Sequence, residues 1–196
     1  MPEDFLVFTG RPNAGKSSII RAITGLKVIV GKEPGTTRNL ELYSLAKGMT
    51  LVDMPGYGRS LRGGRDAEDH IKDQILDFLK ENASKIVLAV HVVNTSTFIE
   101  TVGRLGKKGF ISIDVEMVHY MKRDLGIPAI VAANKIDKSG EAEIRDNLDA
   151  LIEEMGPSIK VFPVSARTEK GIGILKDEVH RRLVDRGHKN PFELVR

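Results

Sequence analysis

Eight residues near the start of the chain, Gly10 to Ser17, have the types and spacing that bind phosphate groups. They match the pattern G-x-x-x-x-G-K-[ST], in which successive backbone amides line a concavity for phosphate. Lys16 is expected to reach the β- and γ-phosphates of a nucleotide, and the Ser17 hydroxyl to bind Mg²⁺. The predicted contact residues of this loop are Gly10, Arg11, Pro12, Asn13, Ala14, Gly15, Lys16 and Ser17.

A second segment, Asp53-Met54-Pro55-Gly56, follows one predicted hairpin later. The Asp53 carboxylate could hold Mg²⁺ through a water molecule, and the Gly56 amide could bond a γ-phosphate. An ordinary turn after a strand would explain the same four residues. Their position downstream of a phosphate-binding loop favours the functional interpretation.

The loop between these two segments contains Gly35, Thr36, Thr37, Arg38 and Asn39. A loop threonine can close onto a bound metal and a γ-phosphate, and can release when that phosphate leaves. Spacing does not decide between Thr36 and Thr37, and a solvated turn threonine is the plain alternative.

Asn134-Lys135-Ile136-Asp137 predicts recognition of a guanine base. An aspartate carboxylate only accepts hydrogen bonds, and guanine offers two adjacent donors where adenine offers an acceptor and a C–H. Asp137 would therefore favour guanine and reject adenine. Asn134 would bond the base and neighbouring loops, and the Lys135 stem would cover the ring.

The segment Ser165-Ala166-Arg167 is a weaker signal of the same kind. Its expected contribution is the Ala166 amide, which would donate to the 6-oxygen of guanine.

The elements that must position these segments alternate along the chain. Apolar runs predict strands at 5–9, 49–52, 85–93, 128–133 and 160–164, and residues 39–45 alternate as a half-exposed hairpin partner. Helical periodicity covers 18–23, 66–82, 114–125 and 141–155, and a last helix carries Leu175, Val179 and Leu183. Residues 94–113 are predicted to form an irregular excursion with a short helix.

This alternation predicts an α/β fold with helices on both faces of a mostly parallel six-stranded sheet that has one antiparallel edge strand. Ligands of such sheets bind outside the carboxyl ends of the strands. The candidate segments at 10–17, 53–56, 134–137 and 165–167 each follow a predicted strand, so we expect them to meet at one edge.

Composition limits the possible class of protein. The 196 residues fit one domain, 1–196, and the absence of cysteine excludes disulfides and thiolate metal sites. No apolar run could span a bilayer and the first residues are not a secretory signal, so a cytoplasmic monomer is expected.

The net charge of +3 is mildly basic, and basic residues gather in loops and near the C-terminus, at Arg181, Arg182, Arg186, His188 and Lys189. This distribution suits a partner that carries phosphates. The chain has no tryptophan and no RNA-binding signature, so base stacking is not the expected mode, and no DNA partner is expected.

Taken together, the motifs resemble those of the translation-factor-related P-loop GTPases, which have a Ras-like G domain, over about the whole chain. More narrowly, the chain resembles the EngB (YihA/YsxC) family of ribosome-assembly GTPases, within the TrmE/Era/EngA/YihA superfamily. The most specific residues are Asp53-Met54-Pro55-Gly56-Tyr57-Gly58, supported by Asn13 and by Pro34-Gly35-Thr36-Thr37.

The resemblance implies GTP and GDP as ligands, Mg²⁺ held by Ser17 and Thr37 with Asp53, and a large-subunit ribosomal precursor (rRNA or ribosomal protein) as partner. Two alternatives stay open. The chain could be a GTPase switch for another client, such as tRNA modification or cell division and septation. It could also be a nucleotide-binding interaction module with negligible turnover.

Turnover is expected to be slow, because Tyr57 stands where Ras-like GTPases have a water-orienting glutamine. The residues expected to act in catalysis are Lys16, Thr37, Gly56 and Asn13. Relatives use the asparagine at the position of Asn13 to bind K⁺ beside the phosphates, so K⁺ stimulation is a hypothesis here. The alternative is that Asn13 only caps the loop.

Overall fold

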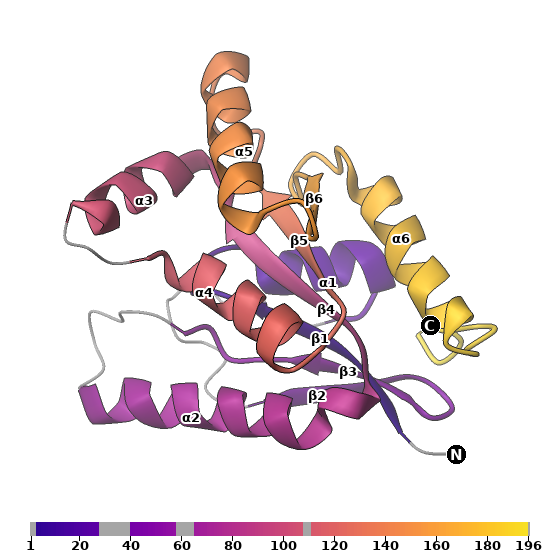
Figure 1. The fold of residues 1–196 in the computed structure, drawn as a ribbon. Helices are drawn as coiled ribbons and strands as arrows, with labels where there is room; N and C mark the ends of the chain where they lie inside the picture. Colours follow the sequence, from indigo (N-terminus) through magenta and orange to yellow (C-terminus); the bar gives the residue numbers. More distant parts are fainter. Residues whose placement is uncertain (1–2, 28–39, 58–64, 108–110, 196) are drawn as a thin grey trace.

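The computed structural model describes residues 3–27, 40–57, 65–107 and 111–195. In these residues, one sheet has the strand order β2-β3-β1-β4-β5-β6 (Figure 1). All neighbouring strands are parallel except β2 and β3, which form the antiparallel hairpin at one edge. The strands are β1 (Asp4–Gly10), β2 (Glu41–Ala46), β3 (Met49–Asp53), β4 (Ile86–Asn94), β5 (Ala129–Asn134) and β6 (Lys160–Pro163). The predicted sheet is confirmed.

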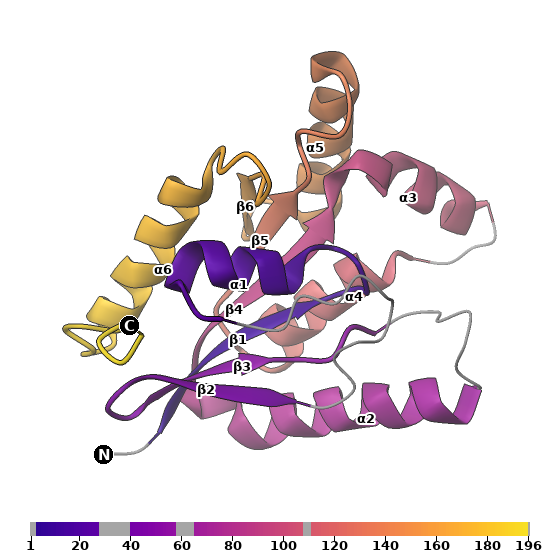
Figure 2. The same cartoon turned by 180° about the vertical axis from the view of Figure 1, so that it is seen from behind.

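Helices cover both faces of this sheet. Helices α1 and α6 lie on one face (Figure 2), and α2, α4 and α5 lie on the other (Figure 1). Helix α3 packs against α5. Their bounds are α1 (Lys16–Thr24), α2 (Arg65–Asn82), α3 (Phe98–Gly106), α4 (Ile113–His119), α5 (Glu141–Met155) and α6 (Ile172–Asp185).

The central strands β1, β4 and β5 are almost completely buried, because helices cover the sheet on both sides. Successive residues of β1 alternate between the two apolar cores. Leu6 and Phe8 pack toward α1 and α6, and Phe5 and Val7 toward the opposite helices. Full burial of one such side chain contributes about 1.5–3 kcal/mol, so this strand anchors both layers.

Residues 94–107 contain the short helix that the sequence predicted within 94–113. A 3₁₀ turn, Thr95–Thr97, leads into α3, which has nine residues and contains Gly103 and Gly106. A Cβ atom at either glycine would meet nothing within 4 Å, so packing does not require glycine there. Gly103, Gly106 and Gly109 obscure the helical period of this stretch in the sequence, which is why the bounds of the helix were not predicted.

The predicted helix 114–125 is present but changes pitch. Helix α4 continues into a π-helical turn, Tyr120–Asp124, in which the Leu125 amide donates to the Tyr120 carbonyl at 3.2 Å, five residues back. Gly126 then adopts a left-handed φ of 67° and ends the element, as predicted.

No helix in the described ranges is both long enough and apolar enough to cross a membrane.

Candidate functional site

The phosphate-binding loop connects β1 to α1, and two of its glycines are enforced by their surroundings. Gly10 has φ 150°, and a Cβ there would lie 2.5 Å from the Val92 carbonyl oxygen of β4. Gly15 has φ 98° and precedes the first helical residue, and its Cβ would lie 2.2 Å from the Asn134 side-chain nitrogen. Any side chain at these positions would therefore displace the neighbouring strand or Asn134.

Three polar side chains converge at the start of α1 and the end of β3. The Lys16 ammonium forms a hydrogen-bonded ion pair with Asp53 Oδ1, and Ser17 Oγ donates to Asp53 Oδ2 at 3.4 Å. Lys16 is 7% exposed and Asp53 is 1% exposed. Burial raises the pKa of the Asp53 carboxyl above its ordinary value, although the Lys16 charge opposes that effect. These groups satisfy one another.

The segment that follows Asp53 rests directly on the phosphate loop. The Met54 amide donates to the Phe8 carbonyl at 3.1 Å. A Cβ at Gly56 would lie 2.9 Å from the Pro12 nitrogen, so glycine is needed for this close approach. The side chain of Met54 is fully buried in the core, so only its backbone can face a ligand.

Asn134 ties the predicted base-binding segments to the phosphate loop. Its Nδ2 donates to the Ala14 carbonyl at 2.9 Å, and its Oδ1 accepts from the Ala166 amide at 3.1 Å. Lys135 has a left-handed φ of 69°, and its ammonium donates to the Asn13 carbonyl. Segments more than 120 residues apart therefore share one bonded cluster at the carboxyl ends of β1 and β5.

Asp137 presents one oxygen without a donor. Its Oδ1 accepts from Ser165 Oγ at 2.6 Å, whereas Oδ2 is buried without a hydrogen-bond partner in the described part of the chain. Arg167 Nη1 lies 3.8 Å from Oδ2. The bond from Ser165 lowers the pKa of Asp137 despite opposing burial, so the carboxylate is ionised at neutral pH. A buried anionic oxygen without a donor fits a ligand that supplies N–H groups.

The predicted residues of the intervening loop cannot be compared in this way. Gly35, Thr36, Thr37, Arg38 and Asn39 lie outside the described residues.

One polar cluster in this region was missed by sequence reasoning. His91 of β4 is 0% exposed, and its ring lies between Tyr57 and Asp114. Asp114 also lies 3.9 Å from Arg11 of the phosphate loop. The only available sequence signal was a histidine inside the otherwise apolar run 86–93.

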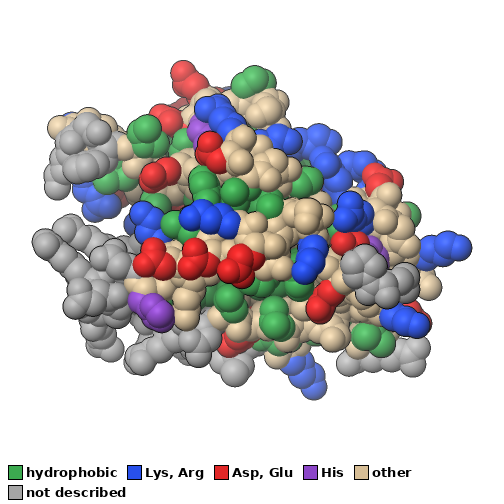
Figure 3. Space-filling model, turned by 60° about the horizontal axis from the view of Figure 1, so that its bottom comes forward, with side chains coloured by type: hydrophobic (Ala, Val, Ile, Leu, Met, Phe, Trp, Pro, Cys, Tyr) green, Lys and Arg blue, Asp and Glu red, His purple; other side chains and the backbone are tan. Residues whose placement is uncertain are grey.

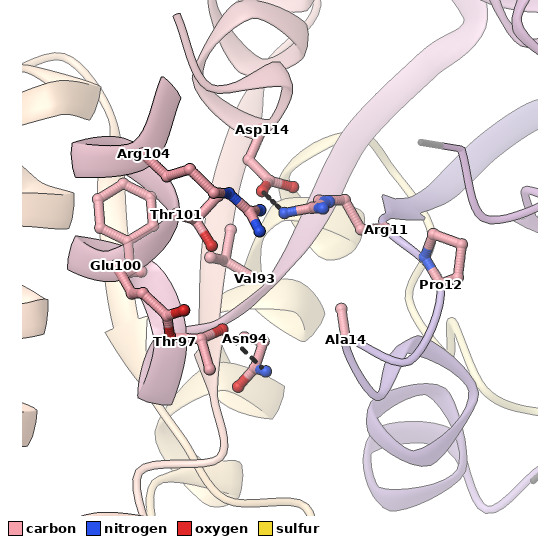
Figure 4. Close-up of a pocket in the computed structure, with 11 residues that line it drawn as sticks. Arg11, Pro12, Ala14, Val93, Asn94, Thr97, Glu100, Thr101, Arg104 and Asp114 are labelled. Atoms are coloured by element: carbon pink, nitrogen blue, oxygen red, sulfur yellow. Dashed lines mark hydrogen bonds and ion pairs between the residues drawn. The ribbon is translucent and has the colours of Figure 1, made fainter. Parts of the chain in front are cut away.

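A pocket of about 280 Å³ opens beside Arg11 (Figure 4). The guanidinium groups of Arg11 and Arg104 and the carboxylate of Asp114 all point into it. Its other lining residues come from the phosphate loop, the end of β4 and the region of α3: Pro12, Ala14, Val93, Asn94, Thr97, Phe98, Glu100 and Thr101.

Comparison with known proteins agrees with this site. The family described as "50S ribosome-binding GTPase" matches residues 5–135, more than half of the chain. The chain is 38% identical to a probable GTP-binding protein EngB of Methanopyrus kandleri, over 96% of this chain and 95% of that protein. It is 36% identical to the protein of the same description from Pyrococcus horikoshii, over 95% of this chain and 87% of that one.

Solved structures show the same fold. A crystal structure of a probable GTP-binding protein EngB has a TM-score of 0.80 and 34% identity, and the match covers 92% of this chain and 99% of that one. Era of Aquifex aeolicus bound to GDP and aluminium fluoride is similar in fold, with a TM-score of 0.64 and 20% identity over 91% of this chain and 56% of that one. The phosphate loop, the guanine-type Asn-Lys-x-Asp segment and these matches together show that the chain belongs to the EngB family of GTP-binding proteins and is a GTPase.

Proposed function

We propose that this GTPase is a slow, GTP-dependent switch that assists assembly of the large ribosomal subunit in the cytoplasm. The observation that carries the proposal is the match of residues 5–135 to a family described as 50S ribosome-binding GTPases. The two other candidates, a switch for another client and an interaction module, share the nucleotide site. They differ from the proposal only in the partner or in the importance of turnover.

At the phosphate end, the backbone amides of residues 10–17 would surround the phosphates, and Lys16 would transfer its ammonium from Asp53 to them. Ser17 would ligate Mg²⁺, with Asp53 acting through water and Thr37 as the second protein ligand. Mg²⁺, when bound, would neutralise charge on the β- and γ-phosphate oxygens. The oxygens of Ser17 and Asp53 lie 3.4 Å apart, which suits a shared cation site.

At the base end, Asp137 Oδ2 would accept the two adjacent donors of guanine. The Ala166 amide donates to Asn134, so the guanine 6-oxygen would compete with Asn134 for that donor. Lys135 lies against the phosphate loop, where its alkyl stem would cover the base. We also propose that Ile136, Ser165 and Arg167 contact the bound nucleotide.

Slow turnover is supported by the position of Tyr57. Its side chain is 3% exposed and faces His91, so it does not orient a water molecule at the γ-phosphate. K⁺ beside Asn13 could supply positive charge instead. Asn13 is exposed and has a left-handed φ of 62°, a conformation that asparagine tolerates. The backbone conformation therefore also explains why asparagine occupies position 13.

The basic residues near the C-terminus give less support for an RNA partner than the sequence suggested. Arg181 and Arg182 pair with Glu178, and Arg186 and His188 pair with Asp4. The face seen in Figure 3 carries acidic and basic side chains side by side. Phosphate contacts would therefore involve other cations, such as the exposed Arg104 and Lys107 at the end of α3.

Sedimentation with purified ribosomal particles tests the proposal. We expect the protein to co-sediment with large-subunit particles in a non-hydrolysable GTP analogue and to remain in the supernatant with GDP. Asp137→Asn is the matched control, because its association should require a xanthosine analogue. Equal association in both nucleotides would exclude a GTP-dependent ribosomal switch.

A further inference from the structure

A continuous chain of polar side chains crosses the core beneath the nucleotide site. Tyr57 Oη lies 3.4 Å from His91 Nδ1, and His91 Nε2 lies 3.0 Å from Asp114 Oδ1. Asp114 Oδ2 lies 3.9 Å from Arg11 Nη1. This series of side chains therefore connects Tyr57, which follows Gly56, to Arg11 of the phosphate loop through His91 and Asp114.

The side chains of Tyr57, His91 and Asp114 are buried, which is costly for polar groups. His91 is 0% exposed, and both Tyr57 and Asp114 are 3% exposed. Burial of an imidazole or a carboxylate among apolar side chains is costly unless its polar atoms are bonded. An apolar residue at position 91 would fill the same space between β4 and α4 without that requirement.

His91 Nδ1 has two candidate partners and can serve only one. Thr9 Oγ1 lies 2.7 Å from this nitrogen, closer than the hydroxyl of Tyr57. The Asp114 carboxylate accepts from Nε2, which fixes the proton there and the orientation of the ring. Nδ1 carries either one lone pair or one N–H in the ring plane, so a full bond to Thr9 excludes a full bond to Tyr57.

The competition for His91 Nδ1 can affect Gly56, because Tyr57 and Gly56 are adjacent in the backbone. Tyr57 directly follows Gly56, whose Cα region touches Pro12 of the phosphate loop. Burial raises the pKa of Tyr57 well above its ordinary value, so its hydroxyl stays protonated and able to donate. A change in the hydrogen bond between Tyr57 and His91 would therefore move the Gly56 amide.

We infer that His91 is a positioning residue for GTP hydrolysis. Oriented by Asp114, it bonds either Thr9 or Tyr57 and thereby sets where Gly56 lies relative to the γ-phosphate. This inference rests on the proposed contact between the Gly56 amide and the γ-phosphate. It adds a residue from β4 and one from α4 to a mechanism that otherwise uses the loops, the start of α1 and the end of β3.

Two near-isosteric variants test the competition. Thr9→Val removes one partner of Nδ1 and leaves the bond to Tyr57, whereas Tyr57→Phe leaves the bond to Thr9. We expect the affinity for a non-hydrolysable GTP analogue, and kcat, to change at least threefold in opposite directions in the two variants. Affinity for GDP should change less than twofold in both, because GDP lacks the γ-phosphate. His70→Gln, which changes an exposed histidine outside this cluster, should stay within twofold of wild type.

The outcomes separate this inference from the proposed function. If the wild-type protein binds no guanine nucleotide, the site assignment fails and the inference fails with it. If it binds normally but the two variants change together, or not at all, only the inference is overturned. A spectroscopic measurement on the unaltered protein is independent of variant folding. The ¹⁵N shift of His91 Nδ1 should differ between the GDP and GTP-analogue complexes while that of exposed His70 does not, and identical His91 shifts would contradict the inference.

Discussion

The phosphate end and the base end of the site both depend on an aspartate, but the two carboxylates are in opposite situations. Asp53 is paired with Lys16 and Ser17, and burial raises its pKa. Asp137 has one oxygen bonded to Ser165 and one that receives no donor from the described residues, and its pKa is lowered. Lys16 must leave Asp53 before it binds phosphate, whereas Asp137 Oδ2 breaks no internal hydrogen bond among the described residues when it accepts a donor from the base. The contrast is between the two carboxylates, because the Ala166 amide must still leave Asn134 before it donates to the guanine 6-oxygen.

The largest effect is expected at the phosphate end. Lys16→Met should reduce GTP turnover about 100- to 1,000-fold, because a charge that stabilises the transferring phosphate is lost. It should also destabilise the free protein by about 3–5 kcal/mol, because Asp53 is left buried without its cation. Steady-state phosphate release and urea unfolding measure the two effects.

The double variant Lys16→Met with Asp53→Asn is the control. It should recover much of the stability without recovering turnover. If Lys16→Met is as stable as wild type, the ion pair between Lys16 and Asp53 does not stabilise the nucleotide-free protein.

At the base end, Asp137→Asn should reduce affinity for GDP about 100-fold or more and raise affinity for xanthosine diphosphate, since the amide offers a donor where guanine also donates. The two nucleotides can be compared by titration calorimetry. Arg167→Met is a matched control, because Arg167 is 81% exposed along its side chain and approaches the same carboxylate only at 3.8 Å. Unchanged base preference in Asp137→Asn would remove this residue from base recognition.

A smaller effect, of several fold, is expected from the monovalent cation. Turnover in KCl should exceed turnover in an equal concentration of NaCl if Asn13 helps to hold K⁺. Asn13→Gly keeps the left-handed backbone at φ 62° and removes the side-chain ligand, so it should abolish the difference without disrupting the loop. Identical rates of GTP turnover by the wild-type protein in the two salts would show that Asn13 does not hold K⁺ and only suits the left-handed backbone conformation.

The smallest expected effect is on the pH dependence of stability. The pKa of Asp137 is lowered in the folded protein, so its contribution to the unfolding free energy is present above its ordinary value of 3.8 and is lost as the pH falls through the lower native value. Wild type should therefore exceed Asp137→Asn in stability at pH 7, and the difference should shrink below about pH 3.8. Urea unfolding of both proteins at pH 7, 4 and 3 measures the difference, and a constant difference would contradict the assigned Ser165–Asp137 bond.

The sequence determined the fold class and the position of the main site. The spacing from Gly10 to Ser17, the apolar runs before Asp53 and Asn134, and the hairpin around residue 48 are local patterns with local causes, so a single chain displays them. The order of these patterns was enough to predict a parallel sheet whose loops meet at one edge. The residues of the loop at 35–39 stay a prediction.

Tertiary structure alone decided which of these groups touch. Gly15 is fixed by Asn134, and Gly56 by Pro12, across large sequence separations. His91 meets Thr9 because β1 and β4 pair in one register, and it meets Asp114 because α4 packs over that strand. A shift of one residue in β4 would turn His91 to the other face of the sheet, and the same shift in β1 would turn Thr9 away. No local pattern encodes that register, which is why the buried chain from Tyr57 to Arg11 appeared only in the structure.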